Sequence, residues 1–135
     1  RFKSWDGYIQ LVMKHGDVRR TENFSLKSLP IDSPTAQSRL RRIKARSPKL
    51  NADLKLNSKF GVIVSKKISK SAVVRNRIRR RVYEWIRLNL DRIEAESLNL
   101  IWVNNEVVSA MPHQELKDQL EDIFKKAGLI LQASE

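Results

Sequence analysis

The chain has 135 residues, of which 41% are hydrophobic, so it is long enough for one domain with a hydrophobic core. Its formal net charge of +12 and isoelectric point near 10.4 favour a polyanionic partner, either nucleic acid or an anionic membrane surface. The chain contains no cysteine, which excludes a disulfide framework and a thiolate metal site, and we expect a single domain over residues 1–135.

A helix and a strand are predicted first. In residues 5–14 the apolar side chains have helical spacing, at Trp5, Ile9, Val12 and Met13. Gly16 is expected to end this helix in the left-handed conformation that glycine adopts readily. Residues 24–29 alternate between apolar and polar side chains, which predicts a half-buried strand. Its buried face would carry Phe24, Leu26 and Leu29, opposite Ser25 and Lys27.

Residues 30–57 form the longest stretch without a regular pattern. They hold three prolines and a basic cluster of Arg39, Arg41, Arg42, Lys44, Arg46 and Lys49. A short helix over residues 37–45 fits part of this stretch. A loop of this length in a compact domain is usually functional or mobile, so it is either a second binding arm or a solvated insertion.

Two further strands and two helices follow. Residues 60–65 and 98–103 are short apolar runs, which predict buried strands. Between them, a helix is predicted from residues 71–73 to about residue 93, with a buried stripe of Val74, Ile78, Val82, Trp85, Ile86 and Asn89. The last helix is predicted over residues 112–127 and stops at Gly128, with inward side chains of Leu116, Leu120, Ile123, Phe124 and Ala127.

These elements indicate an α/β protein of the α+β two-layer sandwich type, in which a small mixed sheet packs with three helices. The expected order is α-β-β-(β)-α-β-α, where the third strand is optional. At least one strand–helix–strand crossover joins residues 60–65 to residues 98–103.

Positive charge is concentrated around the helix that starts near residue 72. No Asp or Glu occurs between Leu54 and Tyr83, although this segment holds ten Lys or Arg residues. A helix face that is merely solvated usually mixes both signs of charge. Arginine binds two phosphate oxygens at once, and a helix N-terminus also favours phosphate. The segment therefore predicts a nucleic-acid site.

Other functions have less support from the residues. No apolar run approaches the ~20 residues that span a bilayer, and the first residues lack a signal-peptide pattern, so we expect a cytoplasmic protein without a membrane partner. A DNA-binding helix-turn-helix needs a second helix before the basic one, where a strand is predicted. A stand-alone nuclease would have to use His15 or His113, without any metal-ligand spacing. The main alternative is a ribosome-associated or other basic nucleic-acid-binding protein without a cleavage role.

The segment FGVIVSKKISKSAVVRNRIRRRVYEWIR, residues 60–87, resembles the protein subunit of bacterial ribonuclease P. In that family a strand ends in SKK, and AVxRNRIKRR opens a long helix after a short connector; the matching residues here are 65–67 and 72–81. Weaker similarity covers YIQLVMKHG, FSLKSL, LNLIWVN and the last helix. Two departures are the non-aromatic Ile9 and Met13, at positions that are often aromatic, and the long basic residues 30–57.

The resemblance implies a role in a ribonucleoprotein. The protein would bind a catalytic RNA subunit and the 5′ leader of precursor tRNA, and would assist the RNA-catalysed endonucleolytic hydrolysis that matures tRNA 5′ ends. Magnesium would be required by the RNA-containing holoenzyme, and the protein alone would bind no cofactor or metal and supply no catalytic residue. No DNA partner is expected. The resemblance also implies a left-handed βαβ crossover.

Site residues follow from the same resemblance. Contacts with RNA would be made by Lys66, Lys67, Arg75, Asn76, Arg77, Arg79, Arg80 and Arg81. A cleft between the first helix and the sheet would receive the 5′ leader, with the candidates Ile9, Met13, Phe24, Lys27 and Ser65. Base stacking on aromatic side chains contributes ~1–3 kcal/mol per base, and we expect less of it at Ile9 and Met13.

Overall fold

The computed structural model describes residues 8–32, 34, 37–38, 59–93 and 97–130. Its helices are α1 (Tyr8–His15), α3 (Ala72–Leu88) and α4 (His113–Lys126). Its strands are β1 (Asp17–Arg20), β2 (Phe24–Pro30), β3 (Lys59–Ile63) and β4 (Ser97–Val103), and the 3-10 helices are η2 (Leu90–Arg92) and η3 (Glu106–Ser109). Most of the loop predicted over residues 30–57, with its short helix, lies outside the described residues. Within the described ranges, no helix is both long and apolar enough to cross a membrane.

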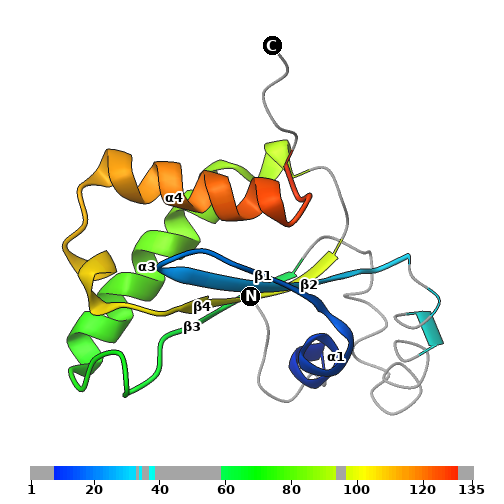
Figure 1. Ribbon diagram of the computed structural model, residues 1–135, viewed down its shortest axis with the longest axis horizontal. Helices are drawn as coiled ribbons and strands as arrows, with labels where there is room; N and C mark the ends of the chain where they lie inside the picture. Colours follow the sequence, from blue (N-terminus) through cyan, green and yellow to red (C-terminus); the bar gives the residue numbers. More distant parts are fainter. Residues whose placement is uncertain (1–7, 33, 35–36, 39–58, 94–96, 131–135) are drawn as a thin grey trace.

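The four strands form one mixed sheet in the order β1-β2-β4-β3 (Figure 1). β2 pairs antiparallel with β1 and with β4, whereas β3 runs parallel to β4 at the other edge. The β3–α3–β4 connection is therefore the predicted crossover, and its left-handedness stays a prediction. A four-stranded mixed sheet with three helices confirms the predicted fold class.

Helices cover both faces of the sheet, as Figure 1 shows. α1 packs on one face, in a buried cluster that comprises Leu11, Val12, Leu29, Ile31, Leu98 and Leu100. α3 and α4 pack on the opposite face, where Phe24 and Leu26 of β2 join the larger cluster. Since side chains alternate along a strand, Leu29 shares its face with Ser25 and Lys27. The prediction that Leu29 lies on the face of Phe24 and Leu26 is wrong for this reason.

α1 and the residues after it differ from the prediction at Met13, at Gly16 and in the strand β1. The predicted start at residues 5–7 lies outside the described ranges, Met13 is 49% exposed, and Leu11 is buried in its place. Gly16 does not have a left-handed backbone. A side chain there would place its Cβ only 2.6 Å from the carbonyl oxygen of Val12, so the close approach of the backbone requires glycine. β1 was not predicted, because all four of its side chains are exposed.

α3 follows the predicted pattern over most of its length. The Ser71 hydroxyl accepts a hydrogen bond from the Val74 amide at 3.3 Å and so caps the N-terminus. Four of the six residues of the predicted buried stripe, Ile78, Val82, Trp85 and Ile86, are buried, whereas Val74 and Asn89 are half-buried. The helix ends at Leu88 rather than near residue 93, and η2 continues the chain. At the end of α4, Gly128 has a φ of 74°, which confirms the predicted left-handed stop.

Candidate nucleic-acid interface

The basic residues from Lys66 to Arg81 form no ion pair with a described carboxylate. The ion pairs in the described part of the chain join Arg87 to Glu84, Arg92 and Lys125 to Glu121, and Lys126 to Asp122. All of these residues lie at or beyond Glu84, so the N-terminal half of α3 keeps its positive charge uncompensated. Like charges at this density repel one another, and a bound polyanion relieves that repulsion.

Two arginines of α3 tie the helix to the connection that precedes it. The guanidinium of Arg75 donates to the carbonyl oxygen of Ser69 at 3.0 Å. Arg79 donates to the Asn76 side-chain oxygen at 2.7 Å and to the Val64 carbonyl at 3.4 Å. Each guanidinium carries five N–H donors, so both arginines keep donors for a phosphate while they hold the connection in place.

Arg81 is committed to the protein itself. Its guanidinium donates to the carbonyl oxygens of Val108 at 2.7 Å, Ser109 at 3.3 Å and Met111 at 2.6 Å. These carbonyls belong to η3 and to the link between η3 and α4. The arrangement indicates a structural role, whereas the similarity of sequence had suggested an RNA contact. Because the acceptors lie 27 to 30 residues along the chain, no local pattern could have revealed this role.

The remaining cations face solvent. The exposed members are Lys66, Lys67, Lys70, Arg77 and Arg80, and they make no hydrogen bond or ion pair with the described part of the chain. The turn that carries Lys66 and Lys67 is closed by a 3.0 Å hydrogen bond from the Ile68 amide to the Ser65 carbonyl. We call these five residues the free cationic surface. Lys70, which was not among the predicted site residues, belongs to it by position and exposure.

The α1 side of the sheet brings together only part of the predicted cleft. The Lys27 ammonium donates to the Met13 carbonyl at 2.7 Å, so these two residues are adjacent. Ile9 is half-buried against the α1 cluster, and Ser65 is exposed just beyond β3. Phe24 does not belong to this group, because it is fully buried in the cluster under α3 and α4. Side chains alternate between the two faces of a strand, and Phe24 and Lys27 are three positions apart, so they point to opposite faces of β2.

The same face carries an aromatic residue that was not predicted as a site residue. Trp102 is half-buried beside the α1 cluster, and its neighbours across the strands are Ser25 and Ile63. Close by, the Asn104 side chain donates to the Ser25 hydroxyl at 2.9 Å. The position of Trp102 in an apolar strand indicated a core residue, and only the strand register shows which face it occupies.

The two histidines are far from each other in the fold. His15 ends α1 on one face of the sheet, and His113 begins α4 on the other (Figure 1). They therefore do not form an acid–base pair. Among the described residues, no group of three His, Cys, Asp or Glu side chains could hold a metal ion.

Comparison with known sequences gives a consistent family. The family model described as Ribonuclease P matches residues 1–128. The ribonuclease P protein component of Clostridium kluyveri is 38% identical over 73 residues, which cover 53% of this chain and 64% of that protein. The corresponding protein of Rickettsia canadensis is 36% identical over 81 residues, which cover 58% of this chain and 69% of that protein. The chain thus matches about two thirds of the length of these relatives.

Solved structures share the fold along nearly the whole chain. The Staphylococcus aureus RNase P protein superposes with a TM-score of 0.67 at 19% identity, covering 96% of this chain and 95% of that one. The Thermotoga maritima RNase P protein, in complex with 1-(4-fluorophenyl)-2-thiourea, gives a TM-score of 0.66 at 16% identity, covering 93% and 98%. At these identities the likeness establishes the common fold.

Proposed function

This chain belongs to the ribonuclease P protein family, and from that premise we propose that it acts as the protein component of a ribonuclease P. In this role it binds a catalytic RNA and assists the magnesium-dependent, endonucleolytic 5′-end maturation of precursor tRNA. The proposal includes a cytoplasmic location, since the substrate is a tRNA precursor. It excludes a catalytic residue or a resident metal in the protein.

The free cationic surface is the observation that carries the proposal. Lys66, Lys67 and Lys70 lie on the connection before α3, and Arg77 and Arg80 project from the helix itself. Arg75 and Arg79 fasten the connection to the helix, so that the lysines and the helix arginines form one preorganised surface. A surface of this kind contacts phosphate oxygens without reading the base sequence, as docking on a structured RNA requires.

Catalysis is assigned to the RNA. The two histidines lie on opposite faces of the sheet, and the described residues offer no cluster of metal ligands. Magnesium ions bound by RNA phosphates would supply the activated water and stabilise the developing charge. The protein contributes by neutralising phosphate repulsion where the RNA docks, which lowers the magnesium concentration that the assembly needs.

The 5′ leader is proposed to bind on the α1 side of the sheet. Lys27 supplies a cation there, beside the exposed Met13, and Trp102 supplies a partly exposed aromatic face. Trp102 offers base stacking that Ile9 and Met13 do not, although it stands on β4 instead of α1. Phe24 is excluded from this site by its burial on the other face.

One reconstitution tests the proposed function. The protein is mixed with its cognate catalytic RNA and precursor tRNA at low magnesium, and correct 5′ cleavage is measured with and without protein. We expect the protein to increase the cleavage rate, and Arg77→Ala together with Arg80→Ala to reduce this effect. The matched control is Arg20→Ala, because Arg20 is an exposed arginine on β1, away from α3.

The other outcomes identify a different function. If the protein binds RNA but leaves correct 5′ cleavage unchanged, the chain is a basic nucleic-acid-binding protein without a cleavage role. If the protein cleaves precursor tRNA alone and His113→Ala abolishes that cleavage, the chain is a stand-alone nuclease.

A further inference from the structure

The solvent-facing side of α3 carries charges that alternate in sign toward its C-terminal end. Arg80, Glu84 and Arg87 follow one another at i, i+4 and i+7, on the side of the helix opposite its buried residues, and all three are exposed. Asp91, which is also exposed, follows in η2. The order along the chain is positive, negative, positive, negative. We call these four residues the alternating stripe.

The alternating stripe is complementary to itself when a second copy runs in the opposite direction. In two antiparallel copies centred between Glu84 and Arg87, each Glu84 lies opposite an Arg87, and each Arg80 lies opposite an Asp91. All four contacts across such a pair join opposite charges. A parallel arrangement in the same register would instead bring like charges together, so the stripe selects the antiparallel one.

Two hollows and two exposed leucines flank the stripe. Leu88 is 60% exposed and lines a hollow of about 340 Å³ on the side of α4, together with Leu116. Leu90 is 51% exposed and lines a hollow of about 410 Å³ on the side of β3, together with Phe60. Alternating charges alone are typical of a solvated helix face. Exposed leucines beside partly apolar hollows on both flanks distinguish this face from a merely solvated one.

The charged groups of the stripe keep bonding capacity for a partner. Within the chain, the Arg87 guanidinium donates to the two Glu84 carboxylate oxygens at 2.6 and 3.1 Å. A carboxylate has about four acceptor sites and a guanidinium has five donors, so both groups retain unused ones. Arg80 and Asp91 form no ion pair with the described residues. A second copy would therefore add ion pairs without breaking the existing one.

We propose that a second copy of this chain docks on this face, with the two α3 helices antiparallel about a two-fold axis that passes between Glu84 and Arg87. In such a contact each flank meets the same flank of the other copy. Leu88 and Leu90 of one copy then enter the hollows that the same leucines line in the other copy. At physiological ionic strength the Debye length is about 8 Å, so the positive charges elsewhere on the two chains are largely screened from each other.

Complementary charge reversal tests this contact without RNA. Glu84→Arg would place two arginines opposite each other in the pair, and Arg87→Glu would place two carboxylates opposite each other. Sedimentation equilibrium should show that each variant self-associates at least about tenfold more weakly than wild type. A 1:1 mixture of the two variants should dimerise again, because both contacts between the unlike chains then join opposite charges. Misfolding of either variant could not produce this recovery.

The matched controls are Glu22→Arg and Arg20→Glu, which change the net charge by the same amounts at exposed positions on or beside β1. Alone and mixed, these controls should associate as wild type does. Wild-type protein that stays monomeric at about 1 mM overturns the inference and leaves this face to solvent or to a different partner. A mixture of Glu84→Arg and Arg87→Glu that associates no better than either variant also overturns it.

Polar replacement of a leucine tests the flanks of the contact. We expect Leu88→Ser to weaken self-association about tenfold, because each dimer loses this apolar side chain twice. Thermal unfolding of the monomer should change little, since the leucine is exposed there. The control is Val107→Ser, at a valine of η3 that is 52% exposed. Equal self-association of wild type and Leu88→Ser contradicts the docking of leucines in the hollows.

The second copy would cover Arg80, which also belongs to the free cationic surface. A docked RNA and a second copy therefore compete for this residue, a consequence that rests on the proposed function. We expect cognate catalytic RNA to dissociate the protein dimer, which sedimentation of fluorescently labelled protein with added RNA measures. An RNA that binds the dimer and leaves it intact contradicts the placement of the second copy over Arg80. Because the charge-reversal experiment contains no RNA, its failure is distinct from a failure of the proposed function.

Discussion

The arginines of α3 differ in what their guanidinium groups contact, and this difference decides what each contributes. Arg81 donates to three backbone carbonyls of η3 and the segment after it, whereas Arg77 projects into solvent with no partner in the described ranges. Arg75 and Arg79 stand between these cases, because each makes hydrogen bonds to the chain and keeps further donors. The arginines of α3 therefore have three roles. Arg81 is structural, Arg75 and Arg79 hold the preceding connection against the helix, and Arg77 is free to bind a partner.

Replacing Arg81 by alanine should destabilise the protein much more than replacing Arg77. Arg81→Ala leaves three carbonyls without their charged donor, and we expect the free energy of unfolding to fall by about 2–3 kcal/mol. Arg77→Ala should change it by less than about 0.5 kcal/mol, because an exposed side chain without partners is lost. Urea unfolding at fixed pH and salt measures both. Equal stability of the two variants would show that the Arg81 hydrogen bonds contribute nothing.

Residue roles were predictable only where the determining contact is local. The cationic character of Arg77 and Arg80 follows from the sequence, and so does the buried stripe of Ile78 and Val82. The hydrogen bonds of Arg81 to η3 could not be predicted from the sequence, because the acceptor carbonyls come from a distant part of the chain. Phe24 was wrongly predicted to line the cleft on the α1 side of the sheet. Because side chains alternate along a strand, the odd separation between Phe24 and Lys27 already places them on opposite faces of β2.

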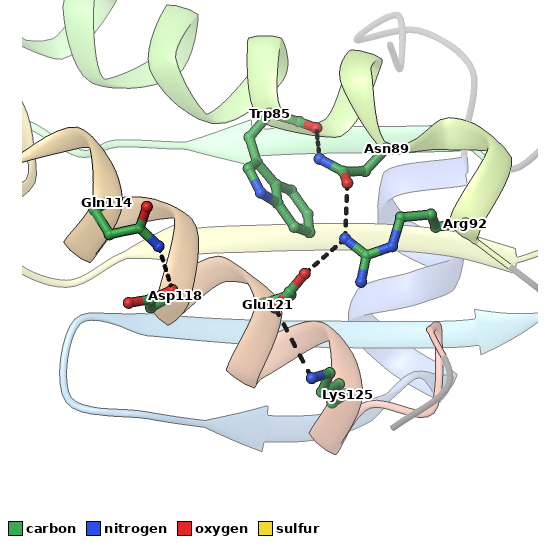
Figure 2. A network of polar contacts seen from close by, with 7 residues as sticks. All are labelled: Trp85, Asn89, Arg92, Gln114, Asp118, Glu121 and Lys125. Atoms are coloured by element: carbon green, nitrogen blue, oxygen red, sulfur yellow. Dashed lines mark hydrogen bonds and ion pairs between the residues drawn. The ribbon is translucent and has the colours of Figure 1, made fainter. Parts of the chain in front are cut away.

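At the scale of elements, a polar network fastens the C-terminal end of α3 to α4 (Figure 2). The Asn89 side chain donates to the Trp85 carbonyl at 2.7 Å and accepts from Arg92 at 2.9 Å. Arg92 of η2 also donates to Glu121 of α4 at 2.6 Å, and Lys125 lies 3.8 Å from the same carboxylate. The network thus connects the C-terminal end of α3, through η2, to α4.

The Glu121 link should make stability depend on pH. The hydrogen bond from Arg92, assisted by the nearby positive charges, lowers the Glu121 pKa from its ordinary value of 4.5. Since the folded state favours the ionised carboxylate, its contribution is present above pH 4.5 and is lost as the pH falls through the lowered pKa. We expect Glu121→Gln to reduce the free energy of unfolding by up to about 1 kcal/mol at neutral pH, because this pair is partly exposed.

Unfolding of wild type and Glu121→Gln across acidic and neutral pH tests this expectation. The difference between them should shrink on acidification, whereas Glu22→Gln, at an exposed carboxylate without an ion pair to the described residues, should behave as wild type. A difference that is constant with pH would contradict the assignment of this stability to the Glu121 charge.

The elements themselves were largely predictable from hydrophobic periodicity. α3, α4, β2, β3 and β4 all appear near their predicted positions, because each buries at least one apolar face against a neighbour. β1 has no such face: its residues Asp17–Arg20 are exposed and join the sheet by backbone pairing with β2. A strand that is held only by backbone hydrogen bonds leaves no pattern of side chains to detect.

On the scale of the whole molecule, charge and fold are arranged together. Ten of the 15 acidic residues occur from Glu84 onward, and Glu84 of α3 and Glu121 and Asp122 of α4 form ion pairs with nearby cations. The connection before α3 and the first turns of this helix carry the five exposed cations of the free cationic surface, and no Asp or Glu lies among them. Among the described residues the fold therefore concentrates positive charge around the N-terminal half of α3, which steers a polyanion to this helix.

The salt dependence of RNA binding should report how many of these cations contact phosphates. If the five residues of the free cationic surface each contact one phosphate, log K should fall with log salt at a slope of about −4, taking ~0.7–0.9 per contact. Arg77→Ala and Arg80→Ala should each make the slope less steep by about one contact. Arg81→Ala, measured where the variant is still folded, should leave the slope unchanged, because its guanidinium is already bound to carbonyls. If Arg81→Ala reduced the slope of log K against log salt as much as Arg77→Ala does, Arg81 would leave η3 to bind RNA. That result would contradict the structural role given to Arg81.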